Sequence, residues 1–550
     1  MAGNIFTQAG FILLLQCIIT SCGSQVNFLP DKNRASGFIL TPVTPAEVPV
    51  FINRPHNVYF TFSVNNPDTG QNRSIRKILL GITPGSDTDA VDELYITCKS
   101  RDNDEPVVFG RSKPSRKMKI EGNYPLNDGS NFITLGITPS PGADLDGRFR
   151  IDRLRIILED KSVLTIPVDS LPWLRFGIVV RAAGQDRCDT YRIPGLVTTN
   201  AGTMIAVYDN RYNNSKDLQE DIDIGMSRSV DGGQTWEPMK VIMDMGGYGG
   251  LPENLNGTGD PAILYDNTTN TIWVAALWMS GSAPDKMLWW ASQPGMTPQE
   301  TGQFMLVKST DDGITWSDPI NITGQIKDPS WQLMLQGPGR GITLDDGTLV
   351  FPAQFKADLG VKAIDGGQYT CHSTIVYSND GGNTWQTGAG AKSNTTEAQV
   401  VQLSDGSLML NMRDDRNRAD KGETNGRAVA VTNDMGRTWR VHPSSNSLLP
   451  EPNCMASLIP ADVRFAGVTK KVLFFSNPND RNSRIKMTVK ASTDEGLTWP
   501  EKHWIELYGP SGYGYSCLTM VDESHVGILY EGTKELYFQR IPVTDFFIDK

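Results

Sequence analysis

The octapeptide Ser229-Val-Asp-Gly-Gly-Gln-Thr-Trp236 occurs in four further versions along this chain. The other copies are Ser309–Trp316, Ser378–Trp385, Thr432–Trp439 and Ser492–Trp499, and all five follow the pattern S/T-x-D-x-G-x-T-W. Successive copies start 54 to 80 residues apart. A motif that returns at such intervals indicates a repeat architecture, so each copy, called an Asp box below, is interpreted as one unit of a repeated fold.

Each position of the Asp box has a structural explanation. The Ser and Asp side chains can hydrogen-bond to the backbone a few residues on and hold a tight turn, and the Gly suits a position with φ > 0. The Thr favours the start of an outgoing strand, and the Trp is large enough to pack between adjacent sheets. The pattern therefore predicts five hairpin turns pinned to a core, with the chemistry located elsewhere.

From Phe176 to residue 550 the chain consists of short strand-like segments and Gly-rich turns, with almost no helical periodicity. Repeated sheets with a pinned turn predict a β-propeller, whose blades close radially and hide their edges. Roughly 375 residues at four strands per blade fit six blades, so one blade is expected to lack an Asp box.

The segment from Val26 to Leu174 has strand character but no Asp box. Its strand candidates are Val58–Val64, Ile75–Ile82, Leu94–Cys98 and Phe149–Leu158. They predict an antiparallel β-sandwich before the propeller, joined to it at Leu171–Arg175. The predicted fold class is therefore all-β, and the sandwich is either similar to a carbohydrate-binding module or a packing appendage without a ligand.

The first 22 residues have the character of an export signal. Phe11–Ile19 is an apolar run too short to span a bilayer comfortably. Ile19-Thr-Ser-Cys22 resembles a bacterial lipobox in which Cys22 would carry the lipid, although no Lys or Arg precedes the apolar run. Residues 1–22 are therefore expected to be a signal peptide, and the protein a periplasmic, outer-membrane or cell-surface lipoprotein, or a secreted protein.

Charge and composition exclude several classes of function. The net charge of −11 on 550 residues argues against a nucleic-acid partner, and any anion site must be a local cluster of Arg. The five cysteines after the signal and the five histidines are scattered, without metal-ligand spacing. Mostly buried free thiols are expected, with at most a disulfide or two, and neither a zinc nor a Ser-His-Asp site is expected.

Polar residues between the Asp boxes are the candidates for a site at the propeller axis. Arg192, Arg413 and Arg484 lie in strand-like settings, and Arg211 and Asp217 share one turn-rich loop. The other candidates, each in a strand-like or turn-rich segment, are Asp260, Glu397, Tyr515 and Glu531. Trp278 and Trp331 either line the same pocket or pack in the core, and the loop Gln336–Arg340 is expected at the pocket edge.

The order of these motifs resembles the bacterial exo-sialidases (neuraminidases) of the glycoside hydrolase family 33 type. The resemblance rests on Tyr191-Arg-Ile-Pro194, the five Asp boxes, Glu397 sixteen residues before Arg413, Phe475-Ser-Asn-Pro478 with Arg484, and Tyr515-Ser-Cys-Leu-Thr519. It covers residues from about 180 to 540. It implies a glycoside hydrolase, an exo-α-sialidase that releases terminal α-linked sialic acids from glycoproteins, glycolipids and oligosaccharides.

The resemblance implies a role for each candidate residue. Arg192, Arg413 and Arg484 would bind the substrate carboxylate, which guanidinium groups can do bidentately. Tyr515 would be the nucleophile, Glu397 its base and Asp217 the general acid and base at the leaving oxygen. Glu531 would orient Arg192, and Asp260 and Arg211 would line the pocket near the ring substituents.

A Tyr nucleophile suits such a substrate. The anomeric carbon of a sialoside already bears a carboxylate, which would repel an anionic nucleophile, and sialidases are an exception to the use of a carboxylate there. A phenol stays neutral until Glu397 removes its proton. The reaction should then retain configuration through a sialyl-tyrosine intermediate, with no metal or cofactor.

Two assignments have neighbours of the same chemical type. The loop of Asp217 also holds Glu220, Asp221 and Asp223, so the acid could be one of these. Asp217 is preferred because it follows Tyr208-Asp-Asn-Arg211 at about the distance found in the family. Tyr513 lies two residues before Tyr515, and Tyr515 is preferred because Ser-Cys-Leu-Thr follows it, as in the family.

Two other functions are compatible with this fold. A non-catalytic Asp-box propeller could bind sialic acid as a receptor or lectin, but a binder would not need both Glu397 and Tyr515. A trans-sialidase, including an intramolecular one that forms an anhydro sugar, would share the same residue order. The expected partners are sialylated glycans, including gangliosides, and the expected state is a monomer.

Overall fold

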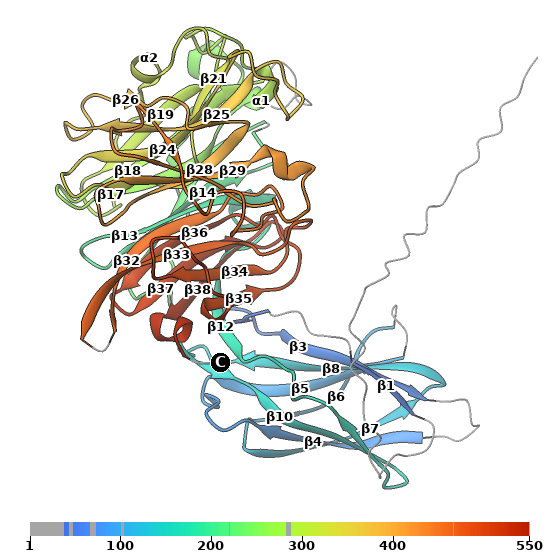
Figure 1. The fold of residues 1–550 in the computed structure, drawn as a ribbon. Coiled ribbons are helices and arrows are strands. Elements are labelled where there is room, and N and C mark those ends of the chain that lie inside the picture. The colour runs from blue at the N-terminus through green and yellow to red at the C-terminus, as the bar shows by residue number, and fades with distance from the viewer. Residues whose placement is uncertain are drawn as a thin grey trace, which may run out of the picture.

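The computed structural model of the protein describes residues 38–42, 48–66, 73–100, 104–218, 220–281, 288–465 and 467–548. The expected signal segment with Cys22 lies outside these residues. The described part of the chain holds no helix long and apolar enough to cross a membrane. Strands dominate it, and a sandwich precedes a propeller (Figure 1), so the predicted all-β fold is confirmed.

Two antiparallel sheets form the sandwich. One sheet contains β1 (Ile39–Pro42), β3 (Asn57–Asn66), β8 (Gly129–Pro139), β5 (Val91–Lys99) and β6 (Val107–Ser112) in that order. The other contains β11 (Val163–Ile166), β10 (Ile151–Leu158), β4 (Arg73–Ile82) and β7 (Lys117–Leu126). Alternate side chains of these strands meet in one apolar core between the sheets, as in β7, where exposed and buried residues alternate.

Six sheets follow and are the blades of the propeller. Blade 1 contains β13 (Thr190–Thr198), β14 (Met204–Arg211), β15 (Ile222–Ser229) and β16 (Lys240–Met243). Blade 2 contains β17 (Asn256–Asp266), β18 (Thr271–Ser280), β19 (Gln303–Ser309) and β20 (Ile320–Asn321). Blade 3 contains β21 (Leu333–Gln336), β24 (Leu349–Ala357), β25 (Thr370–Ser378) and β26 (Gln386–Thr387). Blade 4 contains β28 (Thr395–Gln402), β29 (Leu408–Asp414), β30 (Ala428–Thr432) and β31 (Arg440–Val441). Blade 5 contains β32 (Ser457–Phe465), β33 (Val468–Pro478), β34 (Met487–Ser492) and β35 (Trp504–Tyr508). Blade 6 contains β36 (Ser516–Asp522), β37 (His525–Glu531), β38 (Leu536–Pro542) and β12 (Leu174–Arg181). The short strands β22 (Gly339–Arg340), β23 (Ile342–Thr343) and β27 (Lys392–Ser393) extend blades 2 and 3, and two one-turn helices, α1 (Leu288–Ala291) and α2 (Thr323–Ile326), lie in connections.

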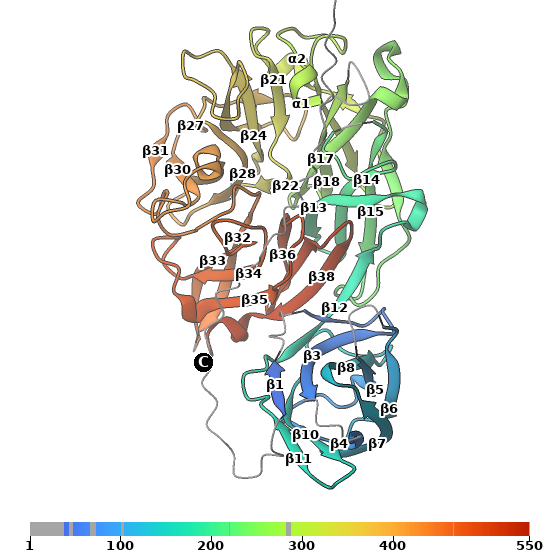
Figure 2. The same ribbon diagram turned by 90° about the vertical axis from the view of Figure 1, so that its right-hand side faces the viewer.

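The ring is closed by a strand from the start of the domain. The outer strand of blade 6 is β12, which precedes blade 1 in the sequence and pairs with β38. At the centre, β13 contacts both β17 and β36, so blade 1 lies beside blades 2 and 6. In Figure 2 the first strands β13, β17, β28, β32 and β36 lie around the middle of the propeller. Each Asp box lies between the third and fourth strands of blades 1 to 5. Blade 6 has no such turn because its third and fourth strands are not consecutive in the chain, which explains five boxes in six blades.

All five Asp boxes share one hydrogen-bond pattern. The backbone N–H of the Gly donates to the first Ser or Thr hydroxyl at 2.9–3.0 Å. The Thr N–H donates to the Asp carboxylate at 2.8–2.9 Å. The Trp packs on a neighbouring blade: Trp236 of blade 1 lies edge-on to Phe538 of blade 6, with ring centroids 5.4 Å apart. The boxes therefore fasten each outer turn and join adjacent blades.

Strand direction places the boxes away from the site residues. Strands alternate in direction within a blade, so the turn from strand three to strand four lies at the opposite end from the connection between strands two and three. Arg192 at the start of β13, Arg211 at the end of β14 and Asp217 after β14 are all at that second end. The Asp boxes are thus part of the scaffold.

Replacing Ser229 by Ala should lower the free energy of unfolding by about 1–3 kcal/mol, because the buried N–H of Gly233 loses its acceptor. Urea titration of the full chain measures the change, and Ser404→Ala, at an exposed turn of blade 4, is the control. Activity per folded molecule should stay the same. A variant that keeps its stability but loses activity would contradict a scaffold role.

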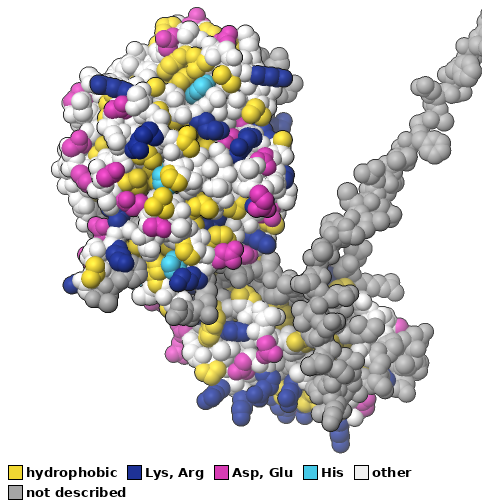
Figure 3. All heavy atoms as spheres, viewed as in Figure 1, with side chains coloured by type: hydrophobic (Ala, Val, Ile, Leu, Met, Phe, Trp, Pro, Cys, Tyr) yellow, Lys and Arg dark blue, Asp and Glu magenta, His cyan; other side chains and the backbone are white. Residues whose placement is uncertain are grey.

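Polar and apolar contacts fix the sandwich to blade 6. Strand β2 (Val50–Phe51) pairs with β12, and β9 (Arg148–Phe149) pairs with it as well. Arg540 of β38 donates to Asp146 at 2.9 Å and to Asp144 at 2.7 Å. Arg148 of β9 forms an ion pair with Asp545, which follows β38. The sandwich is therefore held against blade 6, on the outside of the ring. On the face shown in Figure 3, Lys and Arg side chains gather along the edge of the sandwich farthest from the propeller.

Candidate active site

The predicted site residues meet at one end of the propeller axis. A cavity of about 310 Å³, called the central pocket below, is lined by six of them: Asp217, Asp260, Glu397, Arg413, Arg484 and Tyr515. Arg192, Arg211 and Glu531 are buried and are bonded to these residues or to their neighbours. Strands and connections of five blades thus bring together all nine predicted residues, and their roles remain predictions.

Tyr515 and Glu397 form the centre of the pocket. The Tyr515 hydroxyl donates to the Glu397 carboxylate, and Arg413 donates both to that carboxylate and, at 3.0 Å, to the Tyr515 oxygen. Burial, with the Glu397 charge, raises the pKa of Tyr515 well above its usual range. Burial would also raise the pKa of Glu397, but Arg413 and the Tyr515 hydroxyl outweigh it and lower that pKa. The resting pair is a neutral phenol beside an ionised carboxylate, as a general base and its nucleophile require.

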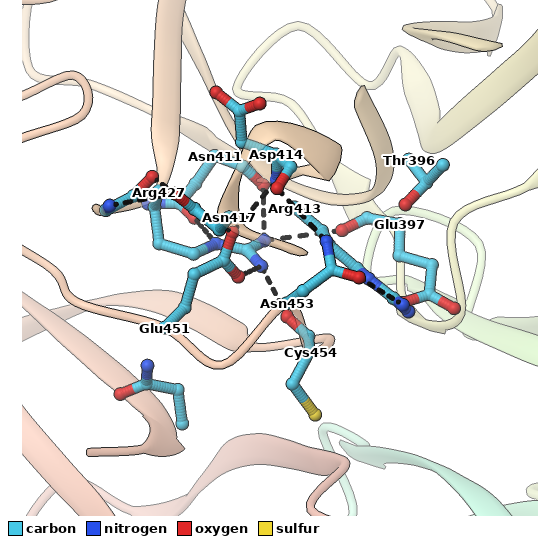
Figure 4. Close-up of polar contacts among 12 residues, drawn as sticks. Thr396, Glu397, Asn411, Arg413, Asp414, Asn417, Arg427, Glu451, Asn453 and Cys454 are labelled. Carbon is cyan, nitrogen blue, oxygen red and sulfur yellow. Dashed lines mark hydrogen bonds and ion pairs between the residues drawn. The ribbon is translucent and has the colours of Figure 1, made fainter. Parts of the chain in front are cut away.

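A buried network holds Arg413 in place. Its second guanidinium nitrogen donates to the Asn453 side chain at 2.9 Å (Figure 4). Behind it, Arg427 and Glu451 form a fully buried ion pair at 2.8 Å, and Arg427 also donates to the carbonyl of Cys454 at 2.7 Å (Figure 4). Pairing and extra hydrogen bonds are what a buried charge requires. Arg413 therefore faces the pocket from a fixed position.

The other two arginines flank the same tyrosine. Arg484 donates to the carbonyl of Tyr513 at 2.8 Å, and its guanidinium carbon lies 5.5 Å from the centre of the Tyr515 ring. Arg192 lies 5.2 Å from the Tyr515 ring and 4.6 Å from the Tyr513 ring. Three guanidinium groups thus surround one phenol, in a protein with a net charge of −11. This is the local cluster of Arg that an anion site requires.

One carboxylate connects Arg192 to the nucleophile. Glu531, at the end of β37, accepts from Arg192 Nε at 3.0 Å and from the backbone N–H of Ile193 at 2.8 Å. Its second oxygen accepts from the backbone N–H of Tyr515 at 2.9 Å. Glu531 therefore positions Arg192 and Tyr515 relative to each other.

Asp217 bridges two arginines at the pocket mouth. It accepts from Arg192 at 2.5 Å and from Arg211 at 2.7 Å, while about half of its side chain remains exposed. Burial would raise the pKa of Asp217, but the two guanidinium groups outweigh it and hold this pKa well below the usual range. In the ligand-free site Asp217 is therefore ionised.

Asp260 has the opposite electrostatic environment. Its backbone N–H donates to Asp209 at 2.9 Å, and Asp209 is itself paired with Arg211 at 2.8 Å. Burial, together with the nearby carboxylates of Asp209 and Glu397, raises the pKa of Asp260 well above its usual value. A protonated Asp260 can donate a hydrogen bond to a substrate oxygen, which an ionised carboxylate cannot do.

A β-bulge in the first strand of three blades positions one residue of each at the pocket. Ile193, Asp260 and Glu397 have φ of 57°, 57° and 27° at β-bulges in the first strands of blades 1, 2 and 4. In each case a side chain from the second strand of the preceding blade accepts from the N–H of that residue: Glu531 for Ile193, Asp209 for Asp260 and Gln354 for Glu397. Bulges re-aim side chains, and such strain persists only where the surroundings fix it.

The structure separates the predicted residues from their neighbours of the same type. Asp221 and Asp223 are not in the lining of the central pocket, and Asp223 accepts from Tyr212 at 2.7 Å. Glu220 is not in the lining either. Among the acids of that loop, Asp217 is therefore the one that reaches the pocket.

The tryptophans and the loop suggested as pocket edges lie elsewhere. Trp278 is fully buried, and Trp331 stacks on Phe355 with ring centroids 4.1 Å apart. Gln336 is fully buried and donates to the carbonyl of Asp260 from behind the pocket, so Gln336–Arg340 is not an edge loop. Trp278 lies in β18, which is flanked by β17 and β19, and Gln336 ends β21, which pairs with β24, so both side chains are packed within the blades. The five described cysteines are buried and free, as expected.

Several residues that shape the site were not predicted. Asp209 and Gln354 fix the bulges, and Asn453 and the Arg427–Glu451 pair support Arg413. Trp289, Trp290 and Asp365 also line the pocket. Asp209 lies two residues before Arg211 in a segment already noted for its spacing. The adjacent pair Trp289-Trp290 is a signal that the sequence did contain.

Comparisons with known proteins agree on one family. Residues 202–528 match the BNR repeat-like domain. The sialidase of Bacteroides fragilis (strain YCH46) is 46% identical over 436 residues, which cover 79% of this chain and 77% of that protein. The sialidase of Micromonospora viridifaciens is 31% identical over 352 residues, or 63% of this chain and 50% of that protein.

Solved structures point the same way. The Hadza microbial sialidase Hz136 superposes with a TM-score of 0.81 at 40% identity, over 91% of this chain and 98% of that one. The intramolecular trans-sialidase of Ruminococcus gnavus gives a TM-score of 0.52 at 18% identity, over 67% of this chain and 98% of that one. The second likeness shows the fold alone.

Proposed function

This chain belongs to the sialidase family, and we propose that its central pocket hydrolyses terminal α-linked sialic acids by double displacement with retention of configuration. The activity is that of an exo-α-sialidase, a glycoside hydrolase. The observation that carries the proposed mechanism is the buried Tyr515 hydroxyl, which donates to Glu397 among three guanidinium groups. The substrates are sialylated glycoproteins, glycolipids and oligosaccharides.

The substrate carboxylate binds where the three arginines converge. Arg192, Arg413 and Arg484 are permanently charged, and together they match a substrate that carries its carboxylate on the anomeric carbon. Glu531 keeps Arg192 in register with Tyr515 while the carboxylate binds. Binding places the anomeric carbon over the Tyr515 oxygen.

In the first step the Tyr515 oxygen attacks the anomeric carbon while its proton passes to Glu397. The bond to the leaving oxygen breaks, and Asp217, which takes up a proton from solvent as the substrate binds, gives that proton to the oxygen. Removing the proton during attack avoids forming a free phenolate, which the raised pKa of Tyr515 disfavours. The product of this step is a sialyl-tyrosine and a free aglycone.

In the second step a water molecule gives its proton to Asp217 and attacks the anomeric carbon. The bond to Tyr515 breaks, and Glu397 returns the proton to the phenol. Two inversions give net retention. The groups that move protons in both steps, Asp217 and Glu397, line the same cavity as the nucleophile.

The anomer released first from 3′-sialyllactose tests this mechanism. Proton NMR of the early reaction should show the α-anomer of free sialic acid before mutarotation. The β-anomer as first product would contradict a covalent intermediate. An anhydro sugar, or transfer to added lactose as the main product, would instead indicate the transferase alternatives.

A further inference from the structure

One sheet of the sandwich carries a basic face at the end of the domain farthest from the propeller. Figure 1 and Figure 2 both show its strands β10, β4 and β7 at that end. Alternate residues of these strands, such as Ile78, Ile120 and Leu154, are buried in the core of the sandwich. The residues between them point to the opposite side of the sheet. Five of these, called the basic face below, are Lys77, Lys117, Lys119, Arg153 and Arg155.

Strand pairing gathers four of these cations into one patch. Arg155 on β10 and Lys119 on β7 are both opposite Leu79 of β4. Arg153 and Lys117 form the next row on the same side, both opposite the residue two positions further along β4. Such rows are about 7 Å apart, and β10 and β7 are about 10 Å apart across β4. Four positive charges are therefore spread over a small plane.

Two carboxylates accompany the basic face. Glu121 is paired with Lys119 at 2.7 Å and with Lys77 at 3.4 Å. Asp152 is exposed and is the extra residue of a bulge in β10. Five cations thus outnumber two carboxylates, although the whole chain has a net charge of −11. Within the described residues, the cations of this face that form no ion pair are Lys117, Arg153 and Arg155.

This arrangement of charge matches an anionic lipid surface. The cations stand on a four-stranded sheet, so they can approach a plane of headgroups together. Each Lys or Arg near an anionic bilayer strengthens binding about fivefold. The rest of the chain is acidic, so the same bilayer would repel it. Attraction and repulsion therefore favour one orientation of the molecule.

The expected lipid on Cys22 would tether the sandwich rather than the propeller. Sixteen residues separate Cys22 from Phe38, where the described part of the chain begins. Sixteen residues can span at most about 55 Å. A tether of that length keeps the sandwich close to a bilayer but does not determine which face of the sandwich meets it.

We propose that the basic face of the sandwich lies on an anionic lipid bilayer and orients the tethered enzyme there. Strands β2 and β9 pair with β12 of blade 6, so the propeller is held on the far side of the sandwich from the bilayer. The central pocket is thereby kept clear of the lipid headgroups. This inference goes beyond the proposed function, because no residue of the basic face lines that pocket.

Vesicle co-sedimentation tests the proposal with residues 23–550, which include every described residue but neither the expected signal nor its lipid. Vesicles of equal parts phosphatidylglycerol and phosphatidylcholine should bind the protein, and vesicles of phosphatidylcholine alone should not. Added salt should weaken the binding, because it screens the charges. The partition coefficient should fall at least about 100-fold in the triple variant that reverses the unpaired cations, Lys117→Glu, Arg153→Glu and Arg155→Glu.

The matched control reverses three exposed cations of blades 4 and 5. It should change the partition coefficient less than about threefold, although it alters the net charge equally. Hydrolysis of a soluble aryl sialoside should be the same in both triple variants and in the wild-type protein, which shows that all three are folded. The control substitutions are Arg437→Glu, Arg440→Glu and Lys470→Glu.

Three results would overturn the proposal. One is equal binding of the wild-type protein to both kinds of vesicle. Another is an equal loss in the two triple variants, which would mean that net charge alone governs binding. The third is binding to heparin without binding to vesicles, which would assign the basic face to an anionic polysaccharide. Vesicle binding does not depend on turnover, so an inactive wild-type protein would refute the proposed function and leave this test intact.

Discussion

Tyr515→Phe is expected to lower kcat/KM for sialoside hydrolysis by about 10³-fold or more, because the nucleophilic oxygen is lost. The phenylalanine ring can keep its burial and its places 5.2 Å and 5.5 Å from the Arg192 and Arg484 guanidinium carbons. What disappears is the hydroxyl that donates to Glu397 and accepts from Arg413. Steady-state kinetics with an aryl sialoside measures the loss, and affinity for free sialic acid should change little.

Tyr513→Phe is the matched control for this variant. Tyr513 belongs to the same segment, and its ring lies 4.6 Å from the Arg192 guanidinium carbon, but it does not line the central pocket. Its loss of activity should stay below about tenfold, as expected for a change outside the reacting atoms. A 2,3-difluoro sialic acid probe should label a peptide that contains Tyr515 in the wild-type protein. Equal losses in both variants, or a label on another residue, would refute Tyr515 as the nucleophile.

The fold could be predicted because its signal is local. An Asp box contains, within eight residues, the acceptor, the glycine and the indole that make its turn, so five copies were enough to indicate blades. For the same reason, a pairing between residues far apart in the chain could not be predicted from the sequence. Strand β12 closes blade 6 by pairing residues more than 350 positions apart, such as Val179 and Tyr537. No local sequence pattern predicts a pairing over that distance.

The site residues divide in the same way. Arg413 follows Glu397 by sixteen residues because both lie on the hairpin of β28 and β29, where Arg413 is opposite Thr396. A fixed spacing of this kind can be recognised in a sequence. The bulges at Asp260 and Glu397 could not be, because the residues there are not glycines and their φ values depend on side chains of the preceding blade. Asp209 and Gln354 were therefore not predicted, although they position the predicted residues Asp260 and Glu397.

Asp217→Ala should lower kcat/KM for 3′-sialyllactose by about 10²–10⁴-fold, the range of a general acid, and that for an aryl sialoside by less than about tenfold. A sugar alkoxide needs a proton to leave, whereas an aryl oxide leaves without one. Asp221→Ala is the control, because Asp221 shares the loop but not the pocket lining. Equal losses on the two substrates would show that Asp217 acts on binding or folding and not on the leaving oxygen.

The pH dependence of kcat and kcat/KM gives a second test of Asp217. Its carboxylate is ionised in the ligand-free site, whereas a general acid must carry a proton. Arg192 and Arg211 hold its pKa below the usual range, so the free enzyme carries it ionised. A substrate carboxylate on Arg192 takes away part of that stabilisation and adds a negative charge nearby, which raises this pKa. A group whose pKa rises on binding takes up a proton as the complex forms. The alkaline limb of kcat for 3′-sialyllactose should therefore lie at higher pH than that of kcat/KM, and neither limb should be present in Asp217→Ala. Coincident limbs in the wild-type enzyme would show that the proton on the leaving oxygen comes from elsewhere.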